Sequence, residues 1–189
     1  MNSQTSIDYG PLAALIGTWQ GDKGIDIAPE SDGTETNPYF ETIRFEAIGD
    51  VTNAEKQVLT ALHYRQIVSR HSNQQVFHDE TGYWMWDSVQ QIVMHSLQIP
   101  RAVSLIAGGK FSDKQEADSI CLRVSAKHDN PDWPIIQSPF MRDNAKTLSF
   151  EHEITVQGDI LNYSETTVVD IYGSPFTHTD NNRLTRINN

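Results

Sequence analysis

Hydrophobic and polar residues alternate with a period of two along two stretches of the chain, residues 116–127 and 147–156. Apolar side chains and one histidine take one parity in these stretches, and mostly polar side chains take the other. Because successive side chains of a β-strand point to opposite faces, both stretches are predicted strands with one buried face. The residues predicted to point inward together are Ile120, Leu122, Val124, Leu148, Phe150, His152, Ile154 and Val156.

Turn residues and strand-favouring residues divide most of the remaining chain into further strands. A short helix is predicted at 9–16, with Pro11 in its first turn. Strands are predicted at 17–27, 39–48, 58–69, 74–86, 90–98, 102–108, 116–127, 147–156, 160–172 and 181–188. Many antiparallel strands with short turns and little helix are typical of a barrel. We therefore predict an all-β fold, an antiparallel up-and-down β-barrel of about ten strands and of calycin type, formed as a single domain by residues 1–189.

Two longer connections interrupt this series of strands. Residues 28–37 are acidic and rich in turn formers, which indicates a loop. Residues 128–146 contain three prolines and apolar residues such as Trp133 and Phe140. A connection of that length in a compact domain is usually functional, and its apolar content argues against disorder. We expect residues 128–146 to form a flap over one end of the barrel.

Charge and composition exclude several classes of protein. The formal net charge is −11, so a nucleic-acid backbone would be repelled, and nucleic acid is not an expected partner. No apolar run approaches the ~20 residues of a membrane span, and the first ten residues lack the features of a secretory signal. Cys121 is the one cysteine, which suits a reducing compartment. We expect a cytoplasmic protein without a membrane span.

Motifs of common catalytic and metal sites are missing from the sequence. There is no His-x-x-x-His pattern and no pair of cysteines, so a zinc site of the usual spacing is not predicted. Neither the nucleophile elbow Gly-x-Ser-x-Gly nor a phosphate-binding P-loop occurs.

Three short motifs, in this order, resemble the nitrobindin family. They are Gly17-Thr18-Trp19-Gln20-Gly21, His78-Asp79-Glu80-Thr81-Gly82-Tyr83, and His178 followed by Leu184-Thr185-Arg186. The resemblance implies a ten-stranded barrel like that of fatty-acid-binding proteins, in which some members hold haem. It also implies that His178 ligates the haem iron and that His78 faces the pocket. A second implied function is that of a ferric-haem enzyme that isomerises peroxynitrite to nitrate.

Four histidines are therefore candidates for the binding site: His78, His95, His152 and His178. His152 is directed inward by the alternation of its strand, and His95 lies between two apolar residues. Each has a structural alternative: His178 as a polar turn residue, His152 as a core histidine bonded to a hydroxyl, and His78 as the partner of Glu80. The expected ligand is a mainly apolar small molecule, with haem as the cofactor alternative. A filled barrel that serves as an interaction module and a homodimer also remain open.

The two ends of the predicted barrel are expected to differ. A large apolar side chain such as Trp19 on the first strand needs a cover, and a guanidinium stacks well on an indole ring. We expect Arg186 or Arg183 to lie over Trp19 and close one end. The ligand site is expected at the other end, under the 128–146 flap, among the four candidate histidines.

Overall fold

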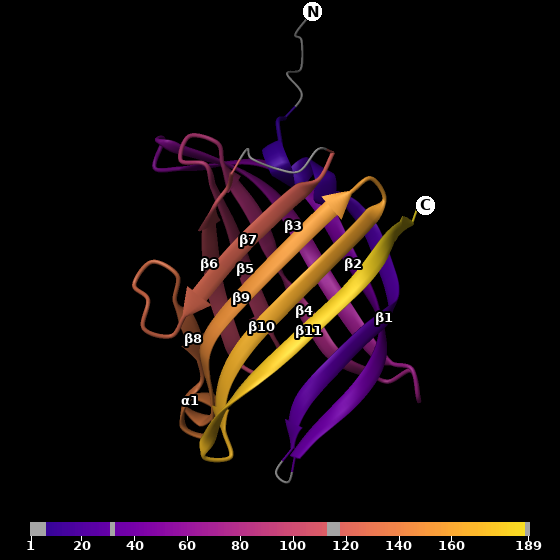
Figure 1. Cartoon of the computed structure of the whole chain (residues 1–189). Coiled ribbons are helices and arrows are strands. Elements are labelled where there is room, and N and C mark those ends of the chain that lie inside the picture. Colours follow the sequence, from indigo (N-terminus) through magenta and orange to yellow (C-terminus); the bar gives the residue numbers. More distant parts are fainter. Residues whose placement is uncertain (1–6, 31–32, 113–117, 188–189) are drawn as a thin grey trace, which may run out of the picture.

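The protein is a closed antiparallel β-barrel in the computed structural model, which describes residues 7–30, 33–112 and 118–187 (Figure 1). Most strands pair with their neighbours along the chain, whereas β8 pairs with β6 and β7 pairs with β9. The barrel closes through the pairing of β1 with β11 and of β5 with β6. The strands of the described residues are β1 (Gly17–Glu30), β2 (Gly33–Asn53), β3 (Gln57–Arg70), β4 (Val76–Asp87), β5 (Ile92–Ile99), β6 (Val103–Lys110), β7 (Ile120–Lys127), β8 (Ile135–Gln137), β9 (Ala145–Gln157), β10 (Ile160–Ile171) and β11 (Ser174–Ile187). Ten of them form the barrel, and β8 is a short addition. The predicted all-β barrel of about ten strands is confirmed.

Two boundaries differ from the prediction at the same end of the barrel. Strands β1 and β2 continue through most of the expected loop at 28–37 and pair along their whole length, from Gly17 with Phe45 to Glu30 with Gly33. Strand β11 begins at Ser174 instead of residue 181, so His178 lies on a strand. Both errors have a common cause, because residues 28–37 and 174–180 are mostly polar and lack the apolar–polar alternation of a strand.

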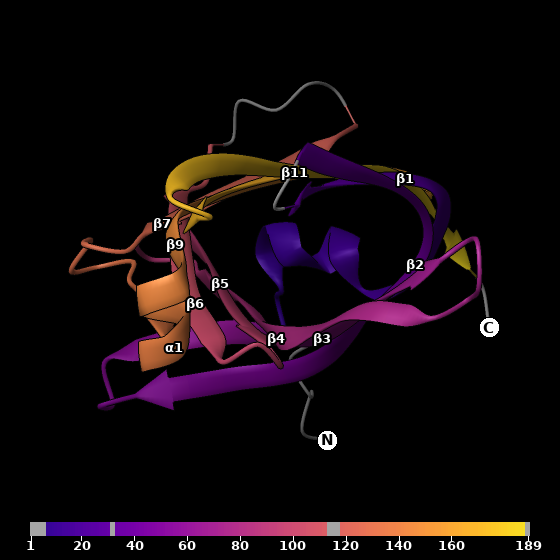
Figure 2. The same cartoon turned by 90° about the horizontal axis from the view of Figure 1, so that it is seen from below.

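One end of the barrel is plugged by the 3₁₀ helix η1 (Gly10–Leu15). In the view from below, η1 lies inside the ring of strands (Figure 2). Trp19 is fully buried, and its Nε1 donates a hydrogen bond of 2.7 Å to the carbonyl of Leu15. The guanidinium carbon of Arg186 lies 4.1 Å from the centre of the Trp19 ring, and Arg186 also donates to the carbonyls of Ala14 and Ile16. The predicted stacking of Arg186 on Trp19 is confirmed.

The predicted inward face is confirmed for β7 and for most of β9. The side chains of Leu122, Val124, Phe150, His152, Ile154 and Val156 are buried, and Ile120 packs against the same core. Leu148 is the exception, because it is the extra residue of a β-bulge opposite Val168 and Val169. The bulge reverses the parity, so Thr147 is buried instead of Leu148, and the prediction for Leu148 was wrong.

Residues 128–146 form part of the wall instead of a flap over the open end. Strand β8 pairs with β6, and the short helix α1 (Pro139–Asn144) follows it. Seen from below, α1 lies at the side of the barrel and not across its opening (Figure 2). The ring of Trp133 packs so closely on Gly108 that a Cβ there would lie 2.3 Å from its Cζ2. The apolar residues of this segment thus fill the gap that opens between β6 and β9.

Candidate functional site

A cavity with polar walls lies inside the barrel, at the end away from η1. Its volume is about 40 Å³. Strands β1–β4, β10 and β11 supply the walls, through Asp26, Tyr39, Gln66, Val68, Phe77, His78, Glu80, Tyr163, Glu165, His178 and Asp180. None of the lining residues comes from 128–146. The expected cover of the site by residues 128–146 is therefore wrong.

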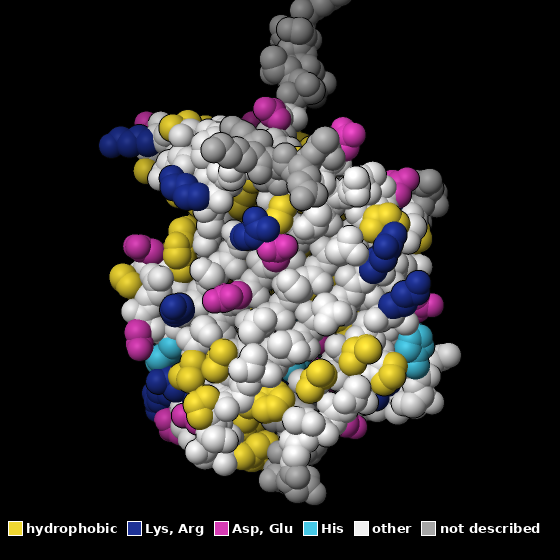
Figure 3. Space-filling view, in the orientation of Figure 1, with side chains coloured by type: hydrophobic (Ala, Val, Ile, Leu, Met, Phe, Trp, Pro, Cys, Tyr) yellow, Lys and Arg dark blue, Asp and Glu magenta, His cyan; other side chains and the backbone are white. Residues whose placement is uncertain are grey.

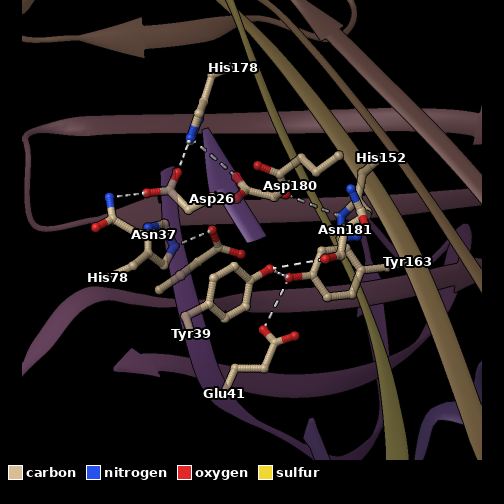
Figure 4. A network of polar contacts seen from close by, with 12 residues as sticks. Asp26, Asn37, Tyr39, Glu41, His78, His152, Tyr163, His178, Asp180 and Asn181 are labelled. Carbon is tan, nitrogen blue, oxygen red and sulfur yellow. Dashed lines mark hydrogen bonds and ion pairs between the residues drawn. The ribbon is translucent and has the colours of Figure 1, made fainter. Parts of the chain in front are cut away.

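The ring of His178 points toward two acidic side chains, Asp26 and Asp180 (Figure 4). Its Nε2 is 2.6 Å from Oδ1 of Asp26 and 3.5 Å from Oδ2 of Asp180. Burial acts to lower the pKa of His178, but the bond to Asp26 and the charge of Asp180 outweigh it, and the pKa is raised above its ordinary value. Burial raises the pKa of Asp180 to about 6. Asn37 donates to the second oxygen of Asp26 over 3.4 Å.

A chain of hydrogen bonds runs from the cavity wall into the core through His78, Glu80, Tyr64 and His95. His78 Nε2 is 3.2 Å from Oε2 of Glu80, and the Tyr64 hydroxyl donates to Oε1 of Glu80 over 2.5 Å. Since the hydroxyl proton of Tyr64 is used on Glu80, the Nε2 of His95, 2.7 Å away, must donate to the Tyr64 oxygen. His95 is fully buried, stacks on Trp84, and has its pKa lowered to about 3 by burial. His95 is thus neutral, with its proton on Nε2.

His152 lies beside this chain and is not hydrogen-bonded. Both ring nitrogens are buried without a hydrogen-bond partner in the described part of the protein. Its Nδ1 lies 3.8 Å from Oε2 of Glu165, and its ring makes an edge contact with that of His95, 5.6 Å between centres. Burial lowers the pKa of His152 to about 4 and raises the pKa of Glu165 well above its ordinary range. The expected alternative, a core histidine bonded to a hydroxyl, is therefore wrong.

A second carboxylate network borders the cavity on the side of β2. Glu41 is fully buried and accepts hydrogen bonds from Asn182, Gln66 and the Tyr163 hydroxyl, at 2.7, 2.9 and 3.2 Å. The hydroxyls of Tyr163 and Tyr39 are 2.7 Å apart. Burial raises the pKa of Glu41 to about 7 despite these three donors. The network fixes both phenol rings, which form part of the cavity wall (Figure 4).

The structure brings all four candidate histidines to the interior at this end. His78 and His178 line the cavity, whereas His95 and His152 lie behind it in the core. His78 is bonded to Glu80, the alternative that the sequence suggested for it. Sequence reasoning named Glu80 as the partner of His78 but did not identify the other acidic and phenolic side chains from distant parts of the sequence, which are Asp26, Tyr39, Glu41, Tyr163 and Glu165. Strand parity places Asp180 in the site as well, since it lies two residues from His178.

Comparisons with known proteins agree with the fold. Residues 8–186 match the family model described as THAP4-like, heme-binding beta-barrel domain. The crystal structure of Rv2717c from M. tuberculosis is similar, with a TM-score of 0.68 and 22% identity over 96% of this chain and 100% of that one. No curated protein matches the sequence. Among the described residues, no helix is long and apolar enough to cross a membrane.

Proposed function

Because the chain belongs to the THAP4-like haem-binding β-barrel family, we propose that it binds a small molecule in the cavity lined by His78 and His178. One observation carries this proposal. Ionisable side chains from five strands converge on a cavity at one end of the barrel, while most of the remaining interior is packed with apolar side chains. Buried charged groups are costly unless they serve a structural or binding purpose, and ligand sites concentrate them. The proposed site residues are His78, His95, His152 and His178.

The walls favour a small cationic or hydrogen-bond-donating ligand over the mainly apolar ligand that the sequence suggested. Four carboxyl groups line the cavity, and only Val68 and Phe77 add purely hydrocarbon side chains. A volume of about 40 Å³ holds a group of a few atoms, whereas drug-sized ligands occupy roughly 300–1,000 Å³. A fatty acid would also place its carboxylate among like charges.

A titration followed on the histidine rings tests this proposal. Methylammonium and oleate are added separately to the protein in buffer with a chelator, and the imidazole signals are recorded by NMR. Methylammonium is expected to shift the signals of His78 and His178 and to leave the exposed His71 unchanged. Glu165→Gln should weaken the effect, and Glu151→Gln, on the outer face of β9, should not. Shifts with oleate alone, or with neither compound, would show the proposed ligand class to be wrong.

Haem is a second candidate, since the family is a haem-binding one and His178 faces inward. The residues present do not fit it in this arrangement. The cavity of about 40 Å³ is far smaller than a porphyrin needs, its acidic walls repel the haem propionates, and the Nε2 of His178 is bonded to Asp26. We therefore derive no haem chemistry, and no step of a peroxynitrite reaction, from these residues.

We also propose a homodimer, formed through an exposed apolar surface. Ile136 on β8, Phe140 on α1 and Tyr172 in the β10–β11 turn are 67%, 71% and 62% exposed. Apolar side chains gather over the lower part of the molecule in the space-filling view (Figure 3). Light scattering during gel filtration should show twice the monomer mass, and Phe140→Glu should restore the monomer. A cytoplasmic location, supported by the single cysteine, is proposed as well, and cell fractionation tests it.

A further inference from the structure

We propose that Asp26, His178 and Asp180 form a binding site for one divalent transition-metal ion at the mouth of the cavity, with Zn²⁺ as the reference ion. One ligand atom from each residue lies within 4.8 Å of the other two, and Asp26 is buried while the other two are half-buried. An ion bonded at about 2.0–2.2 Å to each atom requires separations of about 3–4 Å between them. Small side-chain rotations reach these separations from the observed 2.6 Å and 3.5 Å between His178 and the two carboxylates.

The charges around the cavity also favour a dication. Its lining contains four carboxyl groups, from Asp26, Glu80, Glu165 and Asp180, and two imidazoles, from His78 and His178, but no lysine or arginine. The lining thus holds more carboxyl groups than cationic groups. Arg101, in the turn between β5 and β6, repels both imidazolium groups but is not a lining residue. A bound cation would offset the excess of carboxyl groups.

A third and independent observation is the unpartnered imidazole of His152. It is 7% exposed, and neither of its ring nitrogens has a hydrogen-bond partner among the described residues. The nearest carboxylate is Glu165, 3.8 Å from Nδ1, and Glu165 lines the same cavity as the three proposed ligands. Partners behind the ligands commonly orient a metal site. We assign His152 and Glu165 this positioning role, directly or through a water bound to the ion.

The donor set narrows the kind of ion. One imidazole nitrogen with two carboxylate oxygens suits Zn²⁺, Mn²⁺, Fe²⁺ and Co²⁺, whereas Mg²⁺ and Ca²⁺ prefer oxygen ligands alone. Three protein ligands leave at least one position for water or a further ligand. When the metal ion binds, the proton between His178 Nε2 and Asp26 is released to solvent, and the lone pair of His178 Nε2 bonds the ion. No redox step is involved.

Calorimetry on the full chain tests the site, after treatment with a chelator and its removal. ZnCl₂ is expected to bind with one equivalent, and CoCl₂ to give visible absorption bands from the coordinated ion. His178→Ala and Asp180→Asn should each weaken binding by more than about 100-fold, and Glu165→Gln by about 10–100-fold, as for a positioning residue. His178→Gln is a second variant if His178→Ala unfolds, and circular dichroism reports the fold of each.

The matched control is the pair His128 and Asp129, which does not line the cavity. Nε2 of His128 lies 3.8 Å from Oδ1 of Asp129. His128→Ala should leave zinc binding unchanged. Absence of binding in the wild type, or equal binding in His178→Ala and Asp180→Asn, would overturn the proposal. This inference rests on the proposed function only because both place a ligand in the same cavity. Zinc is tested without an organic ligand, and methylammonium is tested with a chelator present. Failure of the metal proposal is therefore distinguishable from failure of the proposed function.

Discussion

At the scale of single residues, several buried polar groups rely on one hydroxyl or carboxyl group for their hydrogen bonds. Tyr64 is the clearest case, because its oxygen serves Glu80 and His95 at once. Tyr64→Phe leaves Nε2 of His95 unpaired in addition to its Nδ1. We expect the free energy of unfolding to fall by about 1–3 kcal/mol, the cost of a buried unsatisfied group. Urea denaturation measures this free energy. The control is Tyr83→Phe, because Tyr83 is 47% exposed.

His78 gives the stability a dependence on pH whose sign follows from its partner. Burial acts to lower its pKa, but the bond to Glu80 outweighs burial, and the pKa is raised above the ordinary value of about 6.5. The stabilisation is therefore fully present below about pH 6.5 and is lost as the pH rises through the raised pKa. His78→Gln should cost most stability near about pH 5.5 and progressively less toward about pH 9. Val76→Ala, at an exposed position of the same strand and without a titratable group, should show no such trend.

At the scale of elements, the sequence predicted strands wherever one face is apolar and failed where both faces are polar. The alternation through Phe150 and Ile154 correctly identified the buried face of β9. The ends of β1, β2 and β11 were missed because residues 28–37 and 174–180 are mostly polar and show no apolar parity. The histidines of the site were found, but Asp26 and Glu165, which approach His178 and His152, come from other strands, and alternation within one strand cannot identify them.

The wall segment 128–146 packs on the barrel at a position that only a glycine can occupy. Gly108 on β6 lies under the indole ring of Trp133, where an added Cβ would overlap it. Gly108→Ala should push the ring away and destabilise the fold by about 1–3 kcal/mol, as overpacked cores do. Tryptophan fluorescence should shift to the red as Trp133 becomes hydrated. Gly33→Ala, where a Cβ meets open space, is the control, and equal stability of both variants would contradict this packing.

At the scale of the whole molecule, the two ends of the barrel have opposite characters. One end is sealed by η1, Trp19 and Arg186, and the other holds the carboxylates and imidazoles around the cavity. The strands between them pair around the barrel, and the pairing is shortest between β6 and β7. At the polar end, a ligand larger than the cavity would have to separate the β1–β2 and β10–β11 hairpins. That separation would break the bond between Asp26 on β1 and His178 on β11.

Haemin titration shows whether the barrel opens in this way. We expect no saturable one-to-one Soret band, because a porphyrin exceeds the cavity of about 40 Å³ and places its propionates among four carboxyl groups. Any haem that adheres to the surface should give the same spectrum with the wild type, His178→Ala and His128→Ala. A stoichiometric band that His178→Ala abolishes and His128→Ala preserves would contradict the expectation. It would mean that binding of haem stabilises an open barrel by more than the free energy lost when Asp26 and His178 separate.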